Sequence, residues 1–141
     1  MVTPLLMFNS IINLNLTANQ INRLTSLDNR AKRITNNTKA TPLHDSICQH
    51  ACKIIKKIIT GNICSILKGY FEVNNHSKQT RNANFLLKVP RIKLETARSS
   101  FYYMGVKFYN DLPLNLRKVE SYKEFERQLK LHRFQSKLIF E

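Results

Sequence analysis

Apolar side chains recur every three or four residues along two long stretches of this chain, and this spacing constrains the fold more than any other feature. In the first stretch the repeating residues are Ile21, Leu24, Leu27, Ala31 and Ile34. Residues at this interval lie on one face of an α-helix. The second stretch, residues 42–59, has a broader apolar face. Thr41 is its expected N-cap and Pro42 its first helical residue, where a missing N–H costs little. Both stretches are predicted helices.

Three shorter helices are predicted further along, over residues 63–70, 100–110 and 122–133. The first of them carries the apolar residues Ile63, Ile66, Leu67 and Tyr70. Gly61 is placed to end the helix before the first of these. Ser121 and Glu124 form a capping box, in which each side chain bonds a free backbone N–H at the start of the last helix. Only three Gly and four Pro argue against an all-β protein with many turns. The predicted fold class is therefore mostly α, a small helical bundle of about five helices.

The predicted helices fall into two units, separated by a stretch of different composition. Residues 72–84 carry almost no apolar side chains, and Phe85, Leu87 and Val89 then alternate as in a short strand that Pro90 ends. We divide the chain into four parts: an unassigned segment at 1–20, a helical unit at 21–71, a basic linker at 72–98, and a C-terminal helical unit at 99–141. The linker, called the connector below, is basic and partly extended.

Charge is the strongest physical indication of a partner. Lys and Arg together number 23 against 9 Asp and Glu, which gives a net charge of +14 spread over both halves of the chain. This balance favours RNA or DNA, because each phosphate that a cation neutralises releases condensed counterions. An anionic membrane surface is the other polyanion that a basic chain can bind. No apolar run approaches the ~18 residues of a transmembrane helix, so we expect no membrane partner. The sequence gives no indication of an oligomeric state.

Carboxylates suited to catalysis are sparse. Polymerases hold two metal ions with clustered carboxylates. Here Asp28, Asp45 and Asp111 are isolated in the sequence, and Asp28 and Asp45 are expected to be helix caps or surface ion pairs. The isolated glycines form no phosphate-binding loop. We therefore expect no enzymatic activity.

The cysteines allow a metal site but favour a simpler role. His44, Cys48 and Cys52 recur every four residues, so on a helix they would share a face, and Cys64 or His76 could supply a fourth zinc ligand. Small thiols on a half-buried helix more often fill the core. We favour the core and expect neither a metal nor another cofactor. An odd number of cysteines without a secretory signal also predicts reduced thiols and an intracellular location, cytoplasmic or nuclear.

Residues 82–133 contain three features in a fixed order: an S-x-F opening into aromatic residues, an N-x-L-P stop, and a serine-capped amphipathic helix. The matching residues include Ser100, Phe101, Tyr103, Gly105, Lys107, Asn110, Leu112, Pro113, Ser121, Phe125 and Leu129. This order resembles the thumb and tail segment that follows the polymerase core in reverse transcriptases of non-LTR (LINE-type) retrotransposons. Tyr109 stands where that family usually has Trp.

An earlier stretch carries the same resemblance. Residues 21–35, INRLTSLDNRAKRIT, are similar to the helix just after the polymerase palm in that family, with Asp28 in place of the usual Gln. The family's paired-Asp catalytic signature is absent. The resemblance therefore implies a non-catalytic fragment of an RNA-directed DNA polymerase, which binds RNA or DNA through the phosphate backbone. The alternative is a structural relic of a transposable element with no retained activity.

The candidate nucleic-acid-binding residues are basic side chains of the connector and of the first predicted helix. Those of the connector precede the aromatic residues Phe101, Tyr102 and Tyr103, an arrangement that suits single strands because rings stack on bases. A place in the core is the alternative for aromatic residues, and we favour it for Phe101, Phe108 and Tyr109. The candidate phosphate contacts are Arg81, Lys88, Arg91, Lys93, Arg98, Arg30 and Arg33.

Overall fold

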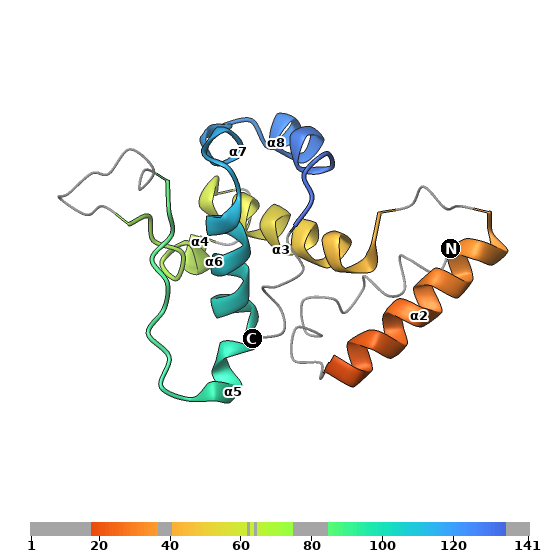
Figure 1. Cartoon of the computed structure of the whole chain (residues 1–141). Helices are drawn as coiled ribbons and strands as arrows, with labels where there is room; N and C mark the ends of the chain where they lie inside the picture. Colours follow the sequence, from red (N-terminus) through yellow and green to blue (C-terminus); the bar gives the residue numbers. More distant parts are fainter. Residues whose placement is uncertain (1–17, 37–40, 62, 64, 75–84, 135–141) are drawn as a thin grey trace.

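The chain folds into helices that pack around one long central helix (Figure 1). The computed structural model describes residues 18–36, 41–61, 63, 65–74 and 85–134. Within them lie α2 (Ala18–Ile34), α3 (Leu43–Ile59), α4 (Ser65–Lys68), α5 (Glu95–Arg98), α6 (Phe101–Asp111), α7 (Leu114–Lys118) and α8 (Tyr122–Leu129). The described residues form no strand, and one isolated antiparallel bridge joins Val73 to Leu87. The mostly-α fold class is confirmed, with two short helices, α5 and α7, beyond those expected.

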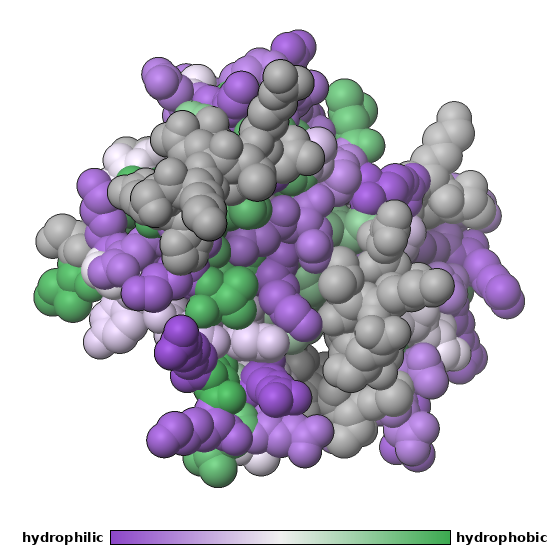
Figure 2. Space-filling model, turned by 60° about the vertical axis from the view of Figure 1, so that its left-hand side comes forward, coloured by the Kyte–Doolittle hydropathy of each residue, from purple (hydrophilic) through white to green (hydrophobic). Residues whose placement is uncertain are grey.

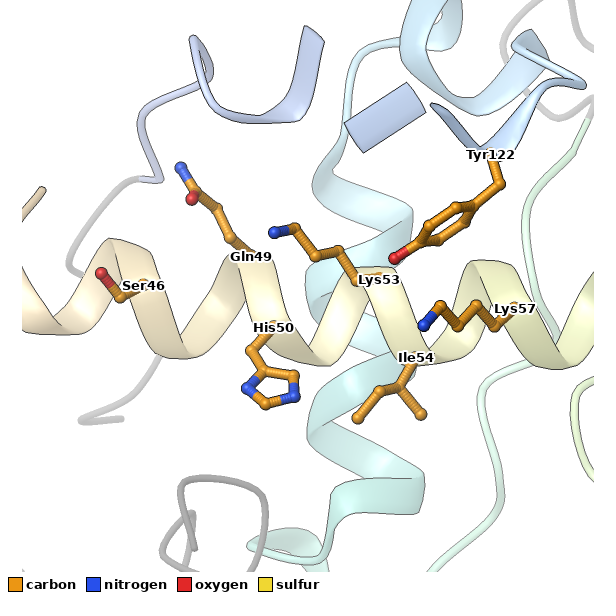
Figure 3. A pocket seen from close by; sticks show the side chains of 7 residues that line it. All are labelled: Ser46, Gln49, His50, Lys53, Ile54, Lys57 and Tyr122. Carbon is orange, nitrogen blue, oxygen red and sulfur yellow. The ribbon is translucent and has the colours of Figure 1, made fainter. Parts of the chain in front are cut away.

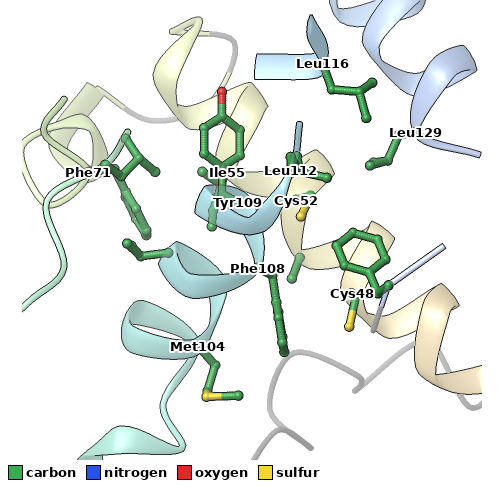
Figure 4. Close-up of a cluster of buried hydrophobic side chains, with 14 of the residues drawn as sticks. Cys48, Cys52, Ile55, Phe71, Met104, Phe108, Tyr109, Leu112, Leu116 and Leu129 are labelled. Carbon is green, nitrogen blue, oxygen red and sulfur yellow. The ribbon is translucent and has the colours of Figure 1, made fainter. Parts of the chain in front are cut away.

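The core forms around α3, which α6 crosses while α7 and α8 pack over it (Figures 1 and 4). The buried face of α3 contributes Cys48, Ala51, Cys52, Ile55 and Ile58, each at most 2% exposed. Side chains from α6, α7 and α8 join them, together with residues outside the helices: Phe71, Leu87, Leu112 and Phe134. Residues from both predicted helical units therefore share one hydrophobic core.

The close approach of α6 to α3 depends on Gly105. A Cβ atom at this position would lie 2.8 Å from Cδ1 of Ile55 and 3.2 Å from Cε2 of Phe101. Both distances are shorter than ordinary van der Waals contacts, so any larger residue would push the Ile55 side chain out of place. The missing side chain of this glycine lets the two central helices pack closely.

The ends of α3 agree in part with the predicted signals. Thr60 is the C-cap and Gly61 follows it with φ of 77°, the left-handed conformation expected of a glycine after a helix. At the other end the helix begins one residue later than predicted. Pro42 is the N-cap, its carbonyl accepts from Ser46 N at 3.0 Å, and no side chain caps this end. The predicted cap at Thr41 is therefore wrong.

The predicted capping box of α8 is also wrong. Ser121 occupies the N-cap position, but its side chain makes no cap hydrogen bond. Glu124 turns outward instead and accepts hydrogen bonds from Arg127 at 2.9 and 3.0 Å and from Gln128 at 2.6 Å. The reciprocal bonds of a capping box are lost because the charge-assisted bonds to arginine compete for the same carboxylate. The helix ends at Leu129, four residues before the predicted end.

The helix predicted over residues 63–70 is shorter than expected, and its apolar face is not buried. Among the described residues of this stretch only Ser65–Lys68 is helical, and Ile66 and Tyr70 are 75% and 57% exposed. Phe71 is buried in their place, with its ring 6.2 Å from that of Phe101 and 5.6 Å from that of Tyr102. Placing Phe71 in the core requires the chain to turn after α4, which leaves the expected apolar face in solvent.

α2 forms as predicted, but its apolar stripe is only partly buried. Leu27 is 56% and Ile34 is 76% exposed, whereas Asp28 is 2% exposed and pairs with Lys32. The Lys32 ammonium also donates to the carbonyl of Thr41 at 2.9 Å, which links α2 to the start of α3. Asp28 is therefore not the cap or surface ion pair that was expected.

Asp45 is buried as well, and it ties the last described residues to α3. It is 5% exposed and accepts from Arg133 Nη1 at 3.1 Å and from the backbone N–H of Phe134 at 3.3 Å. A buried carboxylate needs such donors, because burying an unpaired charge is costly. The expected surface role of Asp45 is thus wrong.

No described helix combines the length and the apolar character that a membrane span requires.

Candidate nucleic-acid interface

The second half of the connector, residues 85–98, is irregular as far as α5, and residues 86–88 fix it to the core. The backbone N–H of Asn74 donates to Leu86 at 2.7 Å, and that of Lys88 donates to Glu72 at 2.9 Å. Leu87, which lies between these bonds, is 2% exposed and joins the hydrophobic core. The predicted alternation is only partly right, because Phe85 and Val89 are 46% and 45% exposed.

Asn110, from the N-x-L-P stretch, holds the connector from the other side. The N–H of Leu87 donates to Asn110 Oδ1 at 2.8 Å, and Asn110 Nδ2 donates back to the Leu87 carbonyl at 2.9 Å. The amide side chain thus satisfies both backbone groups of Leu87, as a neighbouring strand would. This pair of hydrogen bonds fixes the connector against the end of α6.

The residues after Asn110 hold this end of α6 in place. Leu112 is 1% exposed, and its carbonyl accepts from Arg117 Nε at 2.9 Å. The carbonyl of Arg117 in turn accepts from the Lys56 ammonium at 3.3 Å. Burial lowers the pKa of both Lys56 and Arg117. The N-x-L-P stretch therefore works as a junction between the connector, α7 and α3.

Four of the predicted contacts, Lys88, Arg91, Lys93 and Arg98, lie on residues 85–98 and are all exposed. Residues 85–98 contain one acidic residue, Glu95. Lys88 faces Glu72 at 3.8 Å, with side chains 71% and 62% exposed, and such exposed pairs contribute little to stability. The connector therefore presents a net positive surface to solvent. Arg81, the fifth predicted contact here, lies outside the described residues.

A groove of about 1250 Å³ runs along the connector. Its walls come from the bridge between residues 72–74 and 86–88, from the end of α4 and from one face of α6. The lining residues that carry the argument below are Tyr70, Asn74, Lys88, Arg91, Tyr102 and Asn110. Figure 2, which brings this side of the molecule forward, shows hydrophilic and hydrophobic residues interspersed on the surface. The groove thus offers positive charge, amide groups and aromatic rings together.

The aromatic residues divide between the core and this groove. Phe108 and Tyr109 are 0% and 2% exposed, and Phe101 packs against the core, so the core prediction for all three is confirmed. Burial raises the pKa of the Tyr109 hydroxyl to about 12. Tyr70 is different, because it is 57% exposed and contacts Tyr102 edge-on, with ring centroids 6.0 Å apart. The sequence interpretation placed Tyr70 on a buried face and missed it as a site residue.

The two predicted contacts on α2, Arg30 and Arg33, are exposed but far from the connector. Figure 1 shows α2 at one end of the molecule and the connector at the other. The structure therefore places the connector residues along one side of the molecule and leaves the arginines of α2 as a separate basic surface.

A second, smaller pocket of about 330 Å³ lies along α3 (Figure 3). Its residues come from α3 except for Tyr122, at the start of α8. Lys53 pairs with Glu126 at 2.8 Å, and the Lys57 ammonium lies 5.0 Å above the Tyr122 ring. Burial and these two lysines lower the pKa of His50. The pocket is weakly basic, with one of its cations already paired to a carboxylate.

The thiols of the proposed zinc alternative are buried in the core. Cys48 and Cys52 are both 0% exposed, and burial raises the pKa of each thiol above its usual value. His44 Nε2 lies 3.8 Å from Cys48 Sγ, while Cys64 and His76 lie outside the described residues. Among the described residues no group of three or more His, Cys, Asp or Glu is arranged to hold a metal ion. The prediction that Cys48 and Cys52 fill the core is confirmed.

Comparisons with protein-family models, with curated proteins and with solved structures found no match for this chain. The resemblance to non-LTR reverse transcriptases rests on the sequence motifs alone and stays a prediction.

Proposed function

We propose that this chain is a non-catalytic nucleic-acid-binding module that contacts the phosphate backbone of RNA or DNA through its connector. The observation that carries the proposal is the exposure of Lys88, Arg91, Lys93 and Arg98 on the stretch that follows Leu87, the residue that fixes the connector to the core. A fixed segment binds phosphates at a smaller entropic cost than a free one. The resemblance to the C-terminal region of retrotransposon reverse transcriptases supports the same interpretation.

Contacts of this kind give binding without strong sequence preference. Phosphates are the same at every position, so cations that track them set affinity and register but do not read bases. Affinity should fall steeply with salt, with a contribution of about −0.7 per phosphate contact on a single strand to the slope of log K against log[salt]. The net charge of +14 supports this expectation.

The test compares double charge reversals that change the net charge equally. R91E/K93E removes two connector cations, R30E/R33E removes two from α2, and K118E/K123E removes two exposed lysines from the region of α7 and α8. We expect R91E/K93E to weaken binding of all RNA and single-stranded DNA sequences alike and to reduce the salt slope on a single strand by about 1.4, for two lost phosphate contacts. The K118E/K123E variant serves as the matched control and should change affinity far less. Affinity is measured by fluorescence anisotropy across a series of salt concentrations.

Two other outcomes would contradict the connector proposal. If R30E/R33E alone weakens binding, the interface lies on α2 and the connector proposal fails. Equal losses in all three variants would mean that only the net charge matters. Melting curves should be nearly the same for the three variants, because exposed basic residues usually contribute little to stability.

We also propose that the chain has no polymerase activity of its own. The three Asp residues are isolated in sequence, and the described part of the chain holds no cluster of acidic residues able to bind the two metal ions of a polymerase. Primer extension with RNA or DNA templates and Mg²⁺ or Mn²⁺ should therefore yield no product. Incorporation that copurifies with the chain and withstands further purification would overturn this part of the proposal.

The alternative is a structural relic without activity, and the exposed apolar residues of α2 favour it. Leu27 and Ile34 are more than half exposed, as on a surface that has lost the partner that covered it. The relic should aggregate at moderate concentration and show no binding to RNA or DNA even at low salt. Salt-dependent binding that is lost in R91E/K93E would argue against it.

A further inference from the structure

One residue that lines the groove along the connector, Tyr70, has no role in phosphate binding. Tyr70 is a large aromatic side chain, 57% exposed, at a position where the chain has just left α4. Its ring meets that of Tyr102 at 87°, and Tyr102 is half-buried and packs against the core. The contact with Tyr102 holds the Tyr70 ring at the edge of the groove while more than half of its surface stays in solvent.

Tyr70 shares the groove with the cations assigned above. Lys88 and Arg91 line it together with the amide side chains of Asn74 and Asn110, and with Glu72, whose carboxylate lies 3.8 Å from the Lys88 ammonium in an exposed pair. The volume of about 1250 Å³ is larger than most small-molecule sites require. An aromatic ring beside cations that can follow phosphates is the arrangement by which proteins bind single-stranded nucleic acid.

We propose that the groove binds single-stranded RNA or DNA, with one unpaired base stacked on the Tyr70 ring and the adjoining phosphates held by Lys88 and Arg91. This inference rests on the proposed function and adds the form of nucleic acid that the site accepts. A duplex keeps its bases stacked on each other, so it can offer phosphates to the connector but no free base face to Tyr70. Asn110 already uses its amide to hold Leu87, so it is not assigned to reading the base.

The experiment uses the absence of tryptophan from the chain. With no Trp in the sequence, Tyr70→Trp introduces a single fluorescent reporter at the site. A base stacked on the indole should quench its emission as single-stranded oligonucleotide is added. Tyr122→Trp is the matched control, because Tyr122 lines the other pocket, along α3. Its emission should stay nearly constant over the same titration.

Affinity measurements separate stacking from phosphate binding. Tyr70→Ala should weaken binding of a single strand by about 5- to 150-fold, since stacking on an aromatic side chain contributes about 1–3 kcal/mol per base. The same variant should bind a duplex as well as the original chain does. An abasic oligonucleotide, which has the phosphates without the bases, should bind the original chain more weakly, and Tyr70→Ala should cause no further loss with it. Circular dichroism checks that this exposed substitution leaves the fold unchanged.

The outcomes separate this inference from the function on which it rests. Unquenched emission of the Tyr70→Trp chain, with unchanged affinity of Tyr70→Ala for single strands, overturns the stacking site. If R91E/K93E still weakens binding in that case, phosphate binding by the connector stands. Absence of any binding at low salt overturns both proposals, and equal losses of single-strand and duplex binding in Tyr70→Ala would show that Tyr70 supports the connector rather than a base.

Discussion

α2 and the connector both present exposed arginines, yet they are attached to the molecule in opposite ways. α2 is a regular helix of 17 residues whose stripe leaves Leu27 and Ile34 in solvent. Residues 85–98 are mostly irregular, but Leu87 is 2% exposed and both of its backbone groups are bonded to Asn110. The less regular segment is therefore the one joined more closely to the core.

This difference shows that regular secondary structure and tertiary attachment are separate properties. A helix satisfies its own backbone hydrogen bonds, so α2 can form with little of its surface buried. An irregular segment must find partners for its backbone elsewhere, and here the Asn74 and Asn110 contacts supply them. These contacts anchor the connector beside Lys88, which is why we propose the interface there.

Replacement of one buried leucine should have the largest effect and tests whether the connector is attached to the core more firmly than α2. Leu87→Ala should lower the free energy of unfolding by about 2–5 kcal/mol, because it removes a fully packed side chain and leaves a cavity. The control is Leu27→Ala on α2, which is 56% exposed and should change stability by no more than about 0.5 kcal/mol. Urea denaturation of both variants measures the difference. Equal effects would mean that α2 is attached as firmly as the connector.

Removal of the amide that holds Leu87 tests the hydrogen bonds apart from the packing. Asn110→Ala leaves the N–H and the carbonyl of Leu87 without their partner, which should cost about 1–3 kcal/mol. Asn29→Ala, at an exposed position of α2, should be neutral or slightly stabilising, since alanine is the better helix former. Thermal unfolding compares the two. If Asn110→Ala melts with the original chain, the connector does not depend on this pair of bonds.

Local pattern was enough to predict most of the helical elements. The spacing of apolar residues in 21–34 and 42–59 predicted α2 and α3 to within a few residues, and Gly61 marked the end of α3. The aromatic stretch that begins at Ser100 predicted α6. Such signals work because helix formation depends on neighbours three and four residues apart.

The candidate site was predictable only in part, because it depends on pairs that are distant in the sequence. The predicted cations Lys88, Arg91, Lys93 and Arg98 are exposed and lie on one segment. However, Leu87 and Asn110 are 23 residues apart, and no periodicity links them. Tyr70 was expected on the apolar face of a helix, whereas in the structure its neighbour Phe71 is the buried residue. The first relation was missed because a local pattern does not link distant residues, and the second because it does not say which of two neighbouring apolar residues reaches the core.

By itself, the sequence determined that the chain is helical, strongly basic and poor in clustered carboxylates, because these properties depend on composition and short-range spacing. Only the tertiary structure decided that the connector is held by Asn110, that Arg30 and Arg33 lie apart from it, and that Tyr70 faces a groove. The physical reason is that burial is a relation between distant segments that compete for one core. A residue such as Asp45 becomes buried only when a donor from the far end of the chain, here Arg133, reaches it.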